Sequence, residues 1–199
     1  MIGEGSARTI LEELSHLARE VGQSMGHEVE TVARLTRETL DGGGRLFFCG
    51  NGGSAADAQH LAAEYVVRFT GNRRALPALA LTTDSSVLTA CGNDLGFEAI
   101  FARQVEALAA EGDLLFLHST SGESENLIRA AEAGRKLGVT TVAFLAKGGG
   151  RLAEVVDKAL VVPTDSTARA QEIHLAMGHA ICSLVEENLP GPGHPRSDS

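Results

Sequence analysis

The segment CGNGGSAADAQHLAAE, residues 49–64, predicts the end of a strand, a glycine turn and the start of a helix. The preceding run, residues 45–49, is short, mostly apolar and rich in strand-forming residues, which is typical of a buried parallel strand. Three glycines follow it: Gly50, Gly52 and Gly53. Glycine adopts positive φ without steric cost, so this backbone can turn sharply and approach a ligand closely.

The helix after this turn carries the first candidate catalytic residues. Asn51 or Ser54 can cap the helix, whose start would favour an anion or a polyol above the strand. His60 and Glu64 are four residues apart, so they share one helix face. A base and an imidazole able to bind a metal would therefore flank a ligand site, although a single helical histidine more often has a structural role.

Composition excludes several classes of protein. A chain of 199 residues with 43% hydrophobic content is enough for one domain with a sizeable core. The net charge of -9 argues against nucleic acid or an anionic membrane as a partner. Without a signal peptide or an apolar run of ~20 residues, we expect a cytoplasmic protein. Three widely spaced cysteines are expected to be reduced and buried: Cys49, Cys91 and Cys182.

Hydrophobic periodicity predicts strands that alternate with helices. The strands are expected at residues 45–49, 77–81, 113–117, 140–145 and 159–162. The helices are expected as two within 7–40, broken near 22–26, then one carrying His60 and Glu64, then 85–90, 97–110, 125–137 and a last one from Asp165 or Ser166 to about Asn188, with 91–94 as a loop. This alternation predicts an α/β fold, a doubly wound, flavodoxin-like five-stranded parallel sheet with N-terminal helices, whose ligands bind at the carboxyl ends of the strands.

We expect residues 1–189 to form a single domain, and residues 190–199, which lack an apolar anchor, to be a disordered tail.

A second loop, after the third strand, is rich in hydroxyl groups. They belong to Ser119, Thr120, Ser121 and Ser124. With the N–H groups of a helix start, they form a nest suited to phosphate, although an ordinary turn with serine caps would have the same composition. Glu123 and Glu125 would have to point away from a dianion.

The glycine turn also permits a dinucleotide-binding interpretation. The glycines at 50 and 52 fit the loose fingerprint, and Asp84 ends the next strand, where an acid could bind a ribose. However, Asp84 lies further along than the usual ~20 residues, and the hydroxyl-rich loop would have no role.

Four segments together resemble the sugar isomerase (SIS) domain, and within it the sedoheptulose 7-phosphate (phosphoheptose) isomerases. They are CGNGGSAADAQHLAAE, CGNDLGFEAIFARQVEAL, STSGESENLIRA and ARAQEIHLAMGHAICSLVE. The resemblance spans about residues 30–188. It implies an aldose–ketose isomerase that converts sedoheptulose 7-phosphate to D-glycero-D-manno-heptose 7-phosphate, the first step of ADP- or GDP-heptose synthesis.

The resemblance also implies roles for individual residues. Glu64 matches the general base, and His179 its general acid/base partner. The positions that bind zinc, one ion per subunit, match His60, Glu64, Gln171 and His179. The phosphate cradle matches Ser119, Thr120, Ser121 and Ser124. The sugar contacts match Asn51, Gly52, Gly53, Ser54, Arg68, Asp94 and Gln171. Ala168 stands where an aspartate is expected, which bears on substrate preference.

These residue types suit the chemistry, because moving a carbonyl through an enediol requires a base and an acid. A metal could polarise the carbonyl. The resemblance further implies a homotetramer. Gln171 and His179 are eight residues apart, about 12 Å along a helix at ~1.5 Å per residue, so we expect a neighbouring chain to complete the site.

Two non-enzymatic alternatives belong to the same domain family: a DnaA-binding replication-initiation factor and a sugar-phosphate-sensing module. The replication factor lacks residues equivalent to Glu64 and His179, so their presence favours an enzyme. We assign a structural role to His174.

Overall fold

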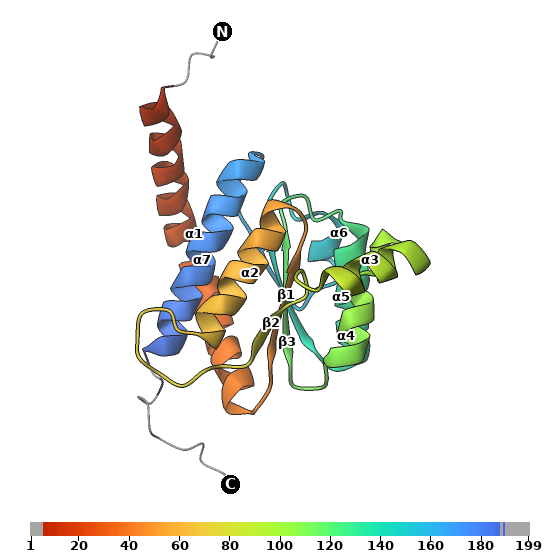
Figure 1. Ribbon diagram of the computed structural model, residues 1–199. Helices are drawn as coiled ribbons and strands as arrows, with labels where there is room; N and C mark the ends of the chain where they lie inside the picture. Colours follow the sequence, from red (N-terminus) through yellow and green to blue (C-terminus); the bar gives the residue numbers. More distant parts are fainter. Residues whose placement is uncertain (1–5, 188, 190–199) are drawn as a thin grey trace.

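The computed structural model describes residues 6–187 and 189 and contains a five-stranded sheet in which every strand pair is parallel. The strands lie in the order β2-β1-β3-β4-β5 (Figure 1). Their bounds are β1 (Leu46–Gly50), β2 (Ala78–Ala80), β3 (Leu114–Ser119), β4 (Thr140–Leu145) and β5 (Lys158–Val161). The predicted doubly wound sheet is therefore confirmed. The predicted tail, residues 190–199, lies outside the described residues.

Helices cover both faces of the sheet (Figure 1). They are α1 (Ala7–Asp41), α2 (Gly53–Val66), α3 (Ser85–Asp94), the 3-10 helix η1 (Phe97–Ala99), α4 (Ala102–Leu108), α5 (Glu125–Lys136), α6 (Gly150–Ala153) and α7 (Thr167–Glu186). Helices α1, α2 and α7 pack on the face of Phe48, Phe116 and Phe144. The others pack on the face of Phe47 and Leu115. Successive strand residues point to opposite faces, so a strand buried on both faces needs a continuous apolar run.

Three sequence predictions about helices are wrong. The predicted break near residues 22–26 is absent, because α1 runs without interruption from Ala7 to Asp41. Glycine costs only about 1 kcal/mol inside a helix, and the apolar stripe of α1 packs against α7. Residues 91–94 continue α3 instead of forming a loop, with Cys91 anchored in the core. The single helix predicted at 97–110 is divided into η1 and α4.

Helices α2 and α7 lie side by side and run in the same direction. Leu61 packs so closely on Gly178 that a Cβ built on that glycine would lie 2.6 Å from a Leu61 methyl group. About two turns before this contact, nearer the start of each helix, Gly53 faces the amide of Gln171. In this parallel arrangement the first turns of both helices meet at the carboxyl ends of the strands. Their later turns meet nearer the amino ends of the strands (Figure 1).

The three cysteines are free and buried, as predicted: Cys49, Cys91 and Cys182. In the described part of the chain, no helix is both long and apolar enough to cross a membrane.

Candidate active site

The glycine turn after β1 has the close backbone approach expected from its sequence. A Cβ on Gly50 would lie 2.5 Å from the carbonyl oxygen of Ser54, so only glycine fits here. Gly52 has φ of 58° and is the N-cap residue of α2, with no side-chain capping bond. The prediction that Asn51 or Ser54 caps this helix is therefore wrong. Ser54 is buried within the first turn, and the Asn51 amide is used elsewhere.

Asn51 pairs with Asn126, the second residue of α5, through two reciprocal amide hydrogen bonds of 2.9 Å each. The pair ties the turn after β1 to the helix that follows β3. It therefore holds the glycine turn and the hydroxyl-rich loop next to one another at the carboxyl edge of the sheet. Asn126 was missed in the sequence. The sequence does contain a signal for it, because Asn126 is a polar residue in the buried first turn of α5, next to Leu127 and Ile128.

The hydroxyl-rich loop links β3 to α5. Ser119 is buried and its Oγ accepts the Gly122 N–H at 3.0 Å, while the Ser121 Oγ accepts the Glu123 N–H at 3.2 Å. Ser124 is the N-cap residue of α5, and its hydroxyl makes no capping bond. A hydroxyl that accepts one N–H can still donate its proton, so these serines can donate to an anion at the start of α5.

The two glutamates beside this loop are engaged by Arg151. The Glu123 carboxylate accepts the backbone N–H of Arg151 at 3.1 Å. Glu125 pairs with the guanidinium groups of Arg151 and Arg129, and their hydrogen bonds lower its pKa. The Glu125 charge is therefore compensated by two guanidinium groups, while the Glu123 carboxylate is held by a backbone N–H.

His60, Glu64 and His179 converge between α2 and α7. The His60 Nε2 lies 2.9 Å from the His179 Nε2 and 3.3 Å from the Glu64 Oε1. One ligand atom from each residue lies within 4.8 Å of the others. The His60 side chain is 45% exposed and that of Glu64 22%, so a ligand can reach them. A carboxylate and two imidazoles here can exchange protons or bind a metal ion.

His179 has an environment that favours its neutral form. Burial lowers its pKa, the nearby His60 lowers it further, and Glu64 partly opposes both effects. The Phe69 ring stacks on the imidazole, with ring centroids 5.3 Å apart. A neutral imidazole can accept a proton on one nitrogen, donate from the other, or bind a metal.

Comparisons with known proteins identify the family of this chain. The profile described as "SIS domain" matches residues 10–146. A phosphoheptose isomerase from Akkermansia muciniphila is 52% identical over 168 residues, 84% of this chain and 89% of the relative. The chain belongs to the phosphoheptose isomerase family. A solved phosphoheptose isomerase from Francisella tularensis superimposes on this family member with a TM-score of 0.88 at 34% identity, over 91% of this chain and 96% of that chain. A phosphoheptose isomerase structure from Neisseria gonorrhoeae superimposes with a TM-score of 0.85 at 38% identity, over 90% of this chain and 96% of that chain.

Within this phosphoheptose isomerase family member, Gln171 lies at the glycine turn, away from the three converging side chains. Its amide would lie 2.6 Å from a Cβ built on Gly53. His179 is eight residues further along α7, about 12 Å at ~1.5 Å per residue. Gln171, predicted to bind both metal and sugar, therefore lies at the carboxyl edge of the sheet. The other three predicted metal ligands lie about two helical turns away from it.

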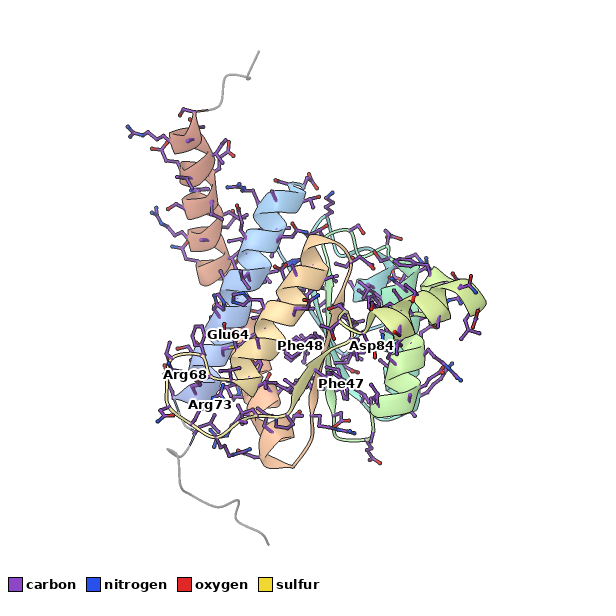
Figure 2. All side chains as sticks on the ribbon, viewed as in Figure 1. Phe47, Phe48, Glu64, Arg68, Arg73 and Asp84 are labelled. Carbon is purple, nitrogen blue, oxygen red and sulfur yellow. The ribbon has the colours of Figure 1, made fainter. Side chains whose placement is uncertain are left out.

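Arg68 and Asp94 are both exposed and lie apart from one another. Arg68 follows the end of α2 on the side where α2 meets α7, near Glu64 (Figure 2). Asp94 is the last residue of α3, in the layer that covers the opposite face of the sheet, and it accepts a bond from Asn93 at 2.7 Å. Thr120 is half-buried in the hydroxyl-rich loop, and Ala168 is exposed in the first turn of α7.

The dinucleotide-binding interpretation finds no support in this family member. The Asp84 carboxylate accepts the Val87 N–H at 3.0 Å and so caps α3. It lies apart from Glu64 (Figure 2). Its short-range structural role explains an acid at the end of β2 without a ribose.

Two further histidines lie beneath the site in this phosphoheptose isomerase family member. His118 is fully buried, and neither ring nitrogen has a hydrogen-bond partner among the described residues. Burial, with a smaller effect of His174, lowers its pKa to about 3. Burial also lowers the pKa of His174 to about 4, although its Nε2 lies 3.0 Å from the Leu145 carbonyl oxygen. This contact agrees with the structural role expected for His174.

Proposed function

We propose that this protein converts sedoheptulose 7-phosphate to D-glycero-D-manno-heptose 7-phosphate, as an aldose–ketose isomerase. The observation that carries the proposal is the convergence of His60, Glu64 and His179, in a chain about half identical to proteins named phosphoheptose isomerase. These are the residue types that proton transfer between neighbouring carbons requires.

The reaction moves a carbonyl group from C2 to C1 through an enediol. Glu64 takes the proton from the carbon, and His179, held neutral by its surroundings, donates an N–H to the carbonyl oxygen. Glu64 then returns its proton to C2, and the C1 hydroxyl gives its proton back to His179 as the C1 carbonyl forms. The net reaction consumes no proton and no electron, so it needs no redox cofactor.

The hydroxyl-rich loop is the proposed phosphate site. Ser119, Thr120, Ser121 and Ser124 supply the hydroxyl groups. The start of the twelve-residue helix α5 adds backbone N–H groups and a partial positive charge. The sugar would extend toward the glycine turn, where Asn51, Gly52, Gly53, Ser54 and Gln171 are the proposed contacts.

We further propose that the site binds zinc. Nitrogen and oxygen donors within 4.8 Å of one another suit Zn2+, and His60, Glu64 and His179 provide three of them. The Gln171 amide oxygen is the proposed fourth ligand, for which the side chain would have to turn from Gly53 toward the other three residues. When bound, the ion would polarise the carbonyl group and stabilise negative charge on its oxygen.

We infer a homo-oligomer, a tetramer by resemblance, whose neighbouring subunits complete the site. Support comes from Asp94, which this chain places in a different layer from the Glu64 side chain. Exposed apolar side chains near both regions also suit a subunit interface, among them Val67 and Phe97. A phosphorylated sugar as substrate agrees with the cytoplasmic location expected from the sequence.

Mixed oligomers can test which chain supplies each residue. Glu64 and His179 lie in one chain, so mixing inactive Glu64→Gln chains with His179→Ala chains should restore no activity. Mixing Glu64→Gln chains with Asp94→Ala chains should restore activity if Asp94 comes from the neighbour. The size of the oligomer is measured by light scattering.

The decisive experiment for the reaction is incubation with sedoheptulose 7-phosphate, followed by NMR detection of the aldose. We expect the aldose signal to grow until equilibrium is reached. Binding of the sugar phosphate without any aldose would instead indicate a sensing module, and the assignment as an enzyme would be wrong.

A further inference from the structure

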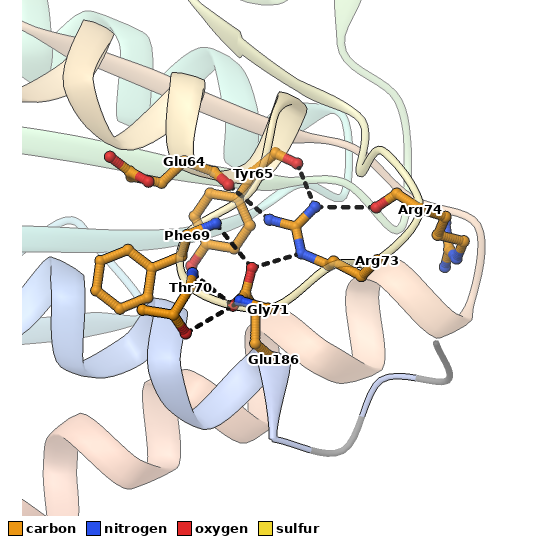
Figure 3. A network of polar contacts seen from close by, with 8 residues as sticks. All are labelled: Glu64, Tyr65, Phe69, Thr70, Gly71, Arg73, Arg74 and Glu186. Atoms are coloured by element: carbon orange, nitrogen blue, oxygen red, sulfur yellow. Dashed lines mark hydrogen bonds and ion pairs between the residues drawn. The ribbon is translucent and has the colours of Figure 1, made fainter. Parts of the chain in front are cut away.

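The segment that joins α2 to β2 is held by one buried ion pair (Figure 3). The Arg73 Nε donates to the Glu186 Oε1 at 2.8 Å. The Arg73 side chain is only 4% exposed and that of Glu186 only 7%. Arg73 belongs to the connecting segment, and Glu186 is the last residue of α7. The pair therefore links the end of α7 to the chain that leaves α2.

Arg73 also binds the end of α2 directly (Figure 3). Its Nη2 donates to the carbonyl oxygen of Glu64 at 2.6 Å, and its Nη1 donates to that of Tyr65 at 2.9 Å. The last carbonyl groups of a helix lack partners within the helix, so a cation there satisfies and stabilises them. One guanidinium thus holds the backbone of the proposed general base.

Glu186 holds the other half of the network (Figure 3). Its carboxylate accepts the backbone N–H groups of Phe69 at 2.8 Å, Thr70 at 2.9 Å and Gly71 at 2.7 Å. These bonds fix the backbone of Phe69, whose ring stacks on His179 with centroids 5.3 Å apart. The same ion pair therefore reaches Glu64 through its backbone and His179 through the Phe69 ring.

We infer that Arg73 and Glu186 are positioning residues that set the Glu64 carboxylate and the His179 imidazole in the geometry needed for proton transfer. The kinetic consequence rests on the proposed isomerase function. Neither residue contacts the reacting groups with its own charge. A displacement of about 1 Å in a catalytic group can cost roughly 10²-fold in rate, so the precision of this network matters for turnover.

Arginine is required for this role because its planar guanidinium donates in several fixed directions. Lysine keeps the charge but concentrates it at one flexible point, and it cannot bond to Glu186 and to the α2 carbonyl groups in the same arrangement. A buried ion pair can often be replaced as a whole by well-packed apolar side chains without loss of stability, although the loss of one partner alone is destabilising. Its presence here is therefore better explained by geometry than by stability alone, and the experiment must separate the two.

The test compares Arg73→Lys with a matched control, Asp113→Asn. Asp113 is also a buried carboxylate, with 4% exposure, that pairs with an arginine, Arg45, and accepts backbone N–H groups. It precedes β3 at the amino end of the sheet, the end opposite the candidate site. Both variants lose a polar anchor, but only Arg73→Lys changes the anchor of the active site.

For Arg73→Lys we expect kcat to fall 10- to 100-fold, with KM for the sugar phosphate within threefold of the wild-type value. Asp113→Asn should lower Tm and leave kcat unchanged. The imidazole proton shifts of His179 should move in Arg73→Lys, because the ring current of Phe69 changes, and stay in place in Asp113→Asn. Glu186→Gln should give the same result as Arg73→Lys, and it replaces Arg73→Lys as the test variant if the lysine variant does not fold.

A folded Arg73→Lys protein with wild-type kcat and unchanged His179 shifts would overturn the inference. So would an equal loss of kcat in Asp113→Asn, or failure of both network variants to fold, since each indicates a role in stability alone. The NMR shifts are measured without substrate. A wild-type protein that does not isomerise the sugar would therefore contradict the proposed function while the shifts still decide the positioning role.

Discussion

His60 and His179 are 119 positions apart in the chain, yet their Nε2 atoms lie 2.9 Å from one another. At this distance one nitrogen must carry a hydrogen and the other must present a lone pair, or a cation must bind both. Glu64, 3.3 Å from the same His60 nitrogen, adds a negative charge. The two imidazoles therefore share a hydrogen or a bound cation, with the Glu64 carboxylate beside them.

Replacing Glu64 by glutamine should remove the base and keep the shape of the side chain. We expect kcat to fall by about 10²–10⁴-fold, the usual contribution of a general base, with binding of the sugar phosphate largely retained. Turnover by NMR and affinity by calorimetry are the two measurements. Glu20→Gln on α1 is the control. A Glu64→Gln enzyme that isomerises at the wild-type rate would show that another group is the base.

The hydroxyl-rich loop can be tested at Ser124, whose hydroxyl makes no capping bond. Ser124→Ala should raise KM for the phosphorylated sugar roughly 10- to 150-fold, because a hydrogen bond to a charged group is worth about 1.5–3 kcal/mol. Ser119→Ala should add to this, but it also removes the bond from the Gly122 N–H. Unphosphorylated sedoheptulose is the control substrate. An unchanged KM in the double variant would place the phosphate elsewhere, for example at Arg68.

The zinc proposal predicts metal-dependent stability. Adding Zn2+ to chelator-treated protein should raise Tm, because an ion that binds only the folded state stabilises it. Bound metal, measured by elemental analysis, should approach one ion per chain. His60→Ala should lose both effects, whereas His16→Ala on α1 should keep them. Full activity of metal-free protein, together with a Tm that no divalent ion shifts, would contradict the proposal.

Gly178 allows α2 and α7 to approach one another. Gly178→Ala places a methyl group against Leu61, and overpacking of this kind costs typically 1–3 kcal/mol. The higher helix propensity of alanine offsets about 1 kcal/mol of that cost. We therefore expect a small fall in Tm but a large fall in kcat, since the two helices carry His60 and His179. Adding Leu61→Ala should restore part of kcat despite lower stability, and no recovery would argue against the steric explanation.

Acid stability should depend on Glu186. Burial disfavours its charge, but the N–H groups of the 69–71 segment and the Arg73 guanidinium outweigh burial and lower its pKa to about 2. A depressed carboxyl pKa gives stability that is complete above the unfolded-state pKa and is lost as pH falls toward 2. The difference in unfolding free energy between wild type and Glu186→Gln should be roughly 3 kcal/mol near neutral pH and shrink between pH 4.5 and 2. Urea titrations at several pH values measure it, and a pH-independent difference would be the contrary result.

The sheet and part of the site could be predicted from sequence because their signals are local. Strands buried on both faces read as continuous apolar runs, and the i,i+4 spacing of His60 and Glu64 places them on one helix face. Long-range partners explain the failures. Asn51 is a good helix cap, but its amide binds Asn126, 75 positions away. Arg73 looks like an exposed loop residue, and only Glu186, 113 positions away, makes its burial possible.

His179 lies in an apolar helix and has no local signal for catalysis, so its role came from the family resemblance alone. The continuity of α1 through Gly22 and Gly26 likewise depends on packing against α7, which residue propensities do not contain. Local chemistry thus predicts where a ligand binds better than it predicts what holds the site in place.

The parallel run of α2 beside α7 makes the number of residues between Gln171 and His179 more important than their identity. Each inserted or deleted residue would turn one end of this interval by about 100° relative to the other and shift it by ~1.5 Å. Gln171 could then no longer face Gly53 while His179 faces His60. Evolution of this enzyme can therefore change the side chains within the interval, but we expect it to keep the interval the same length.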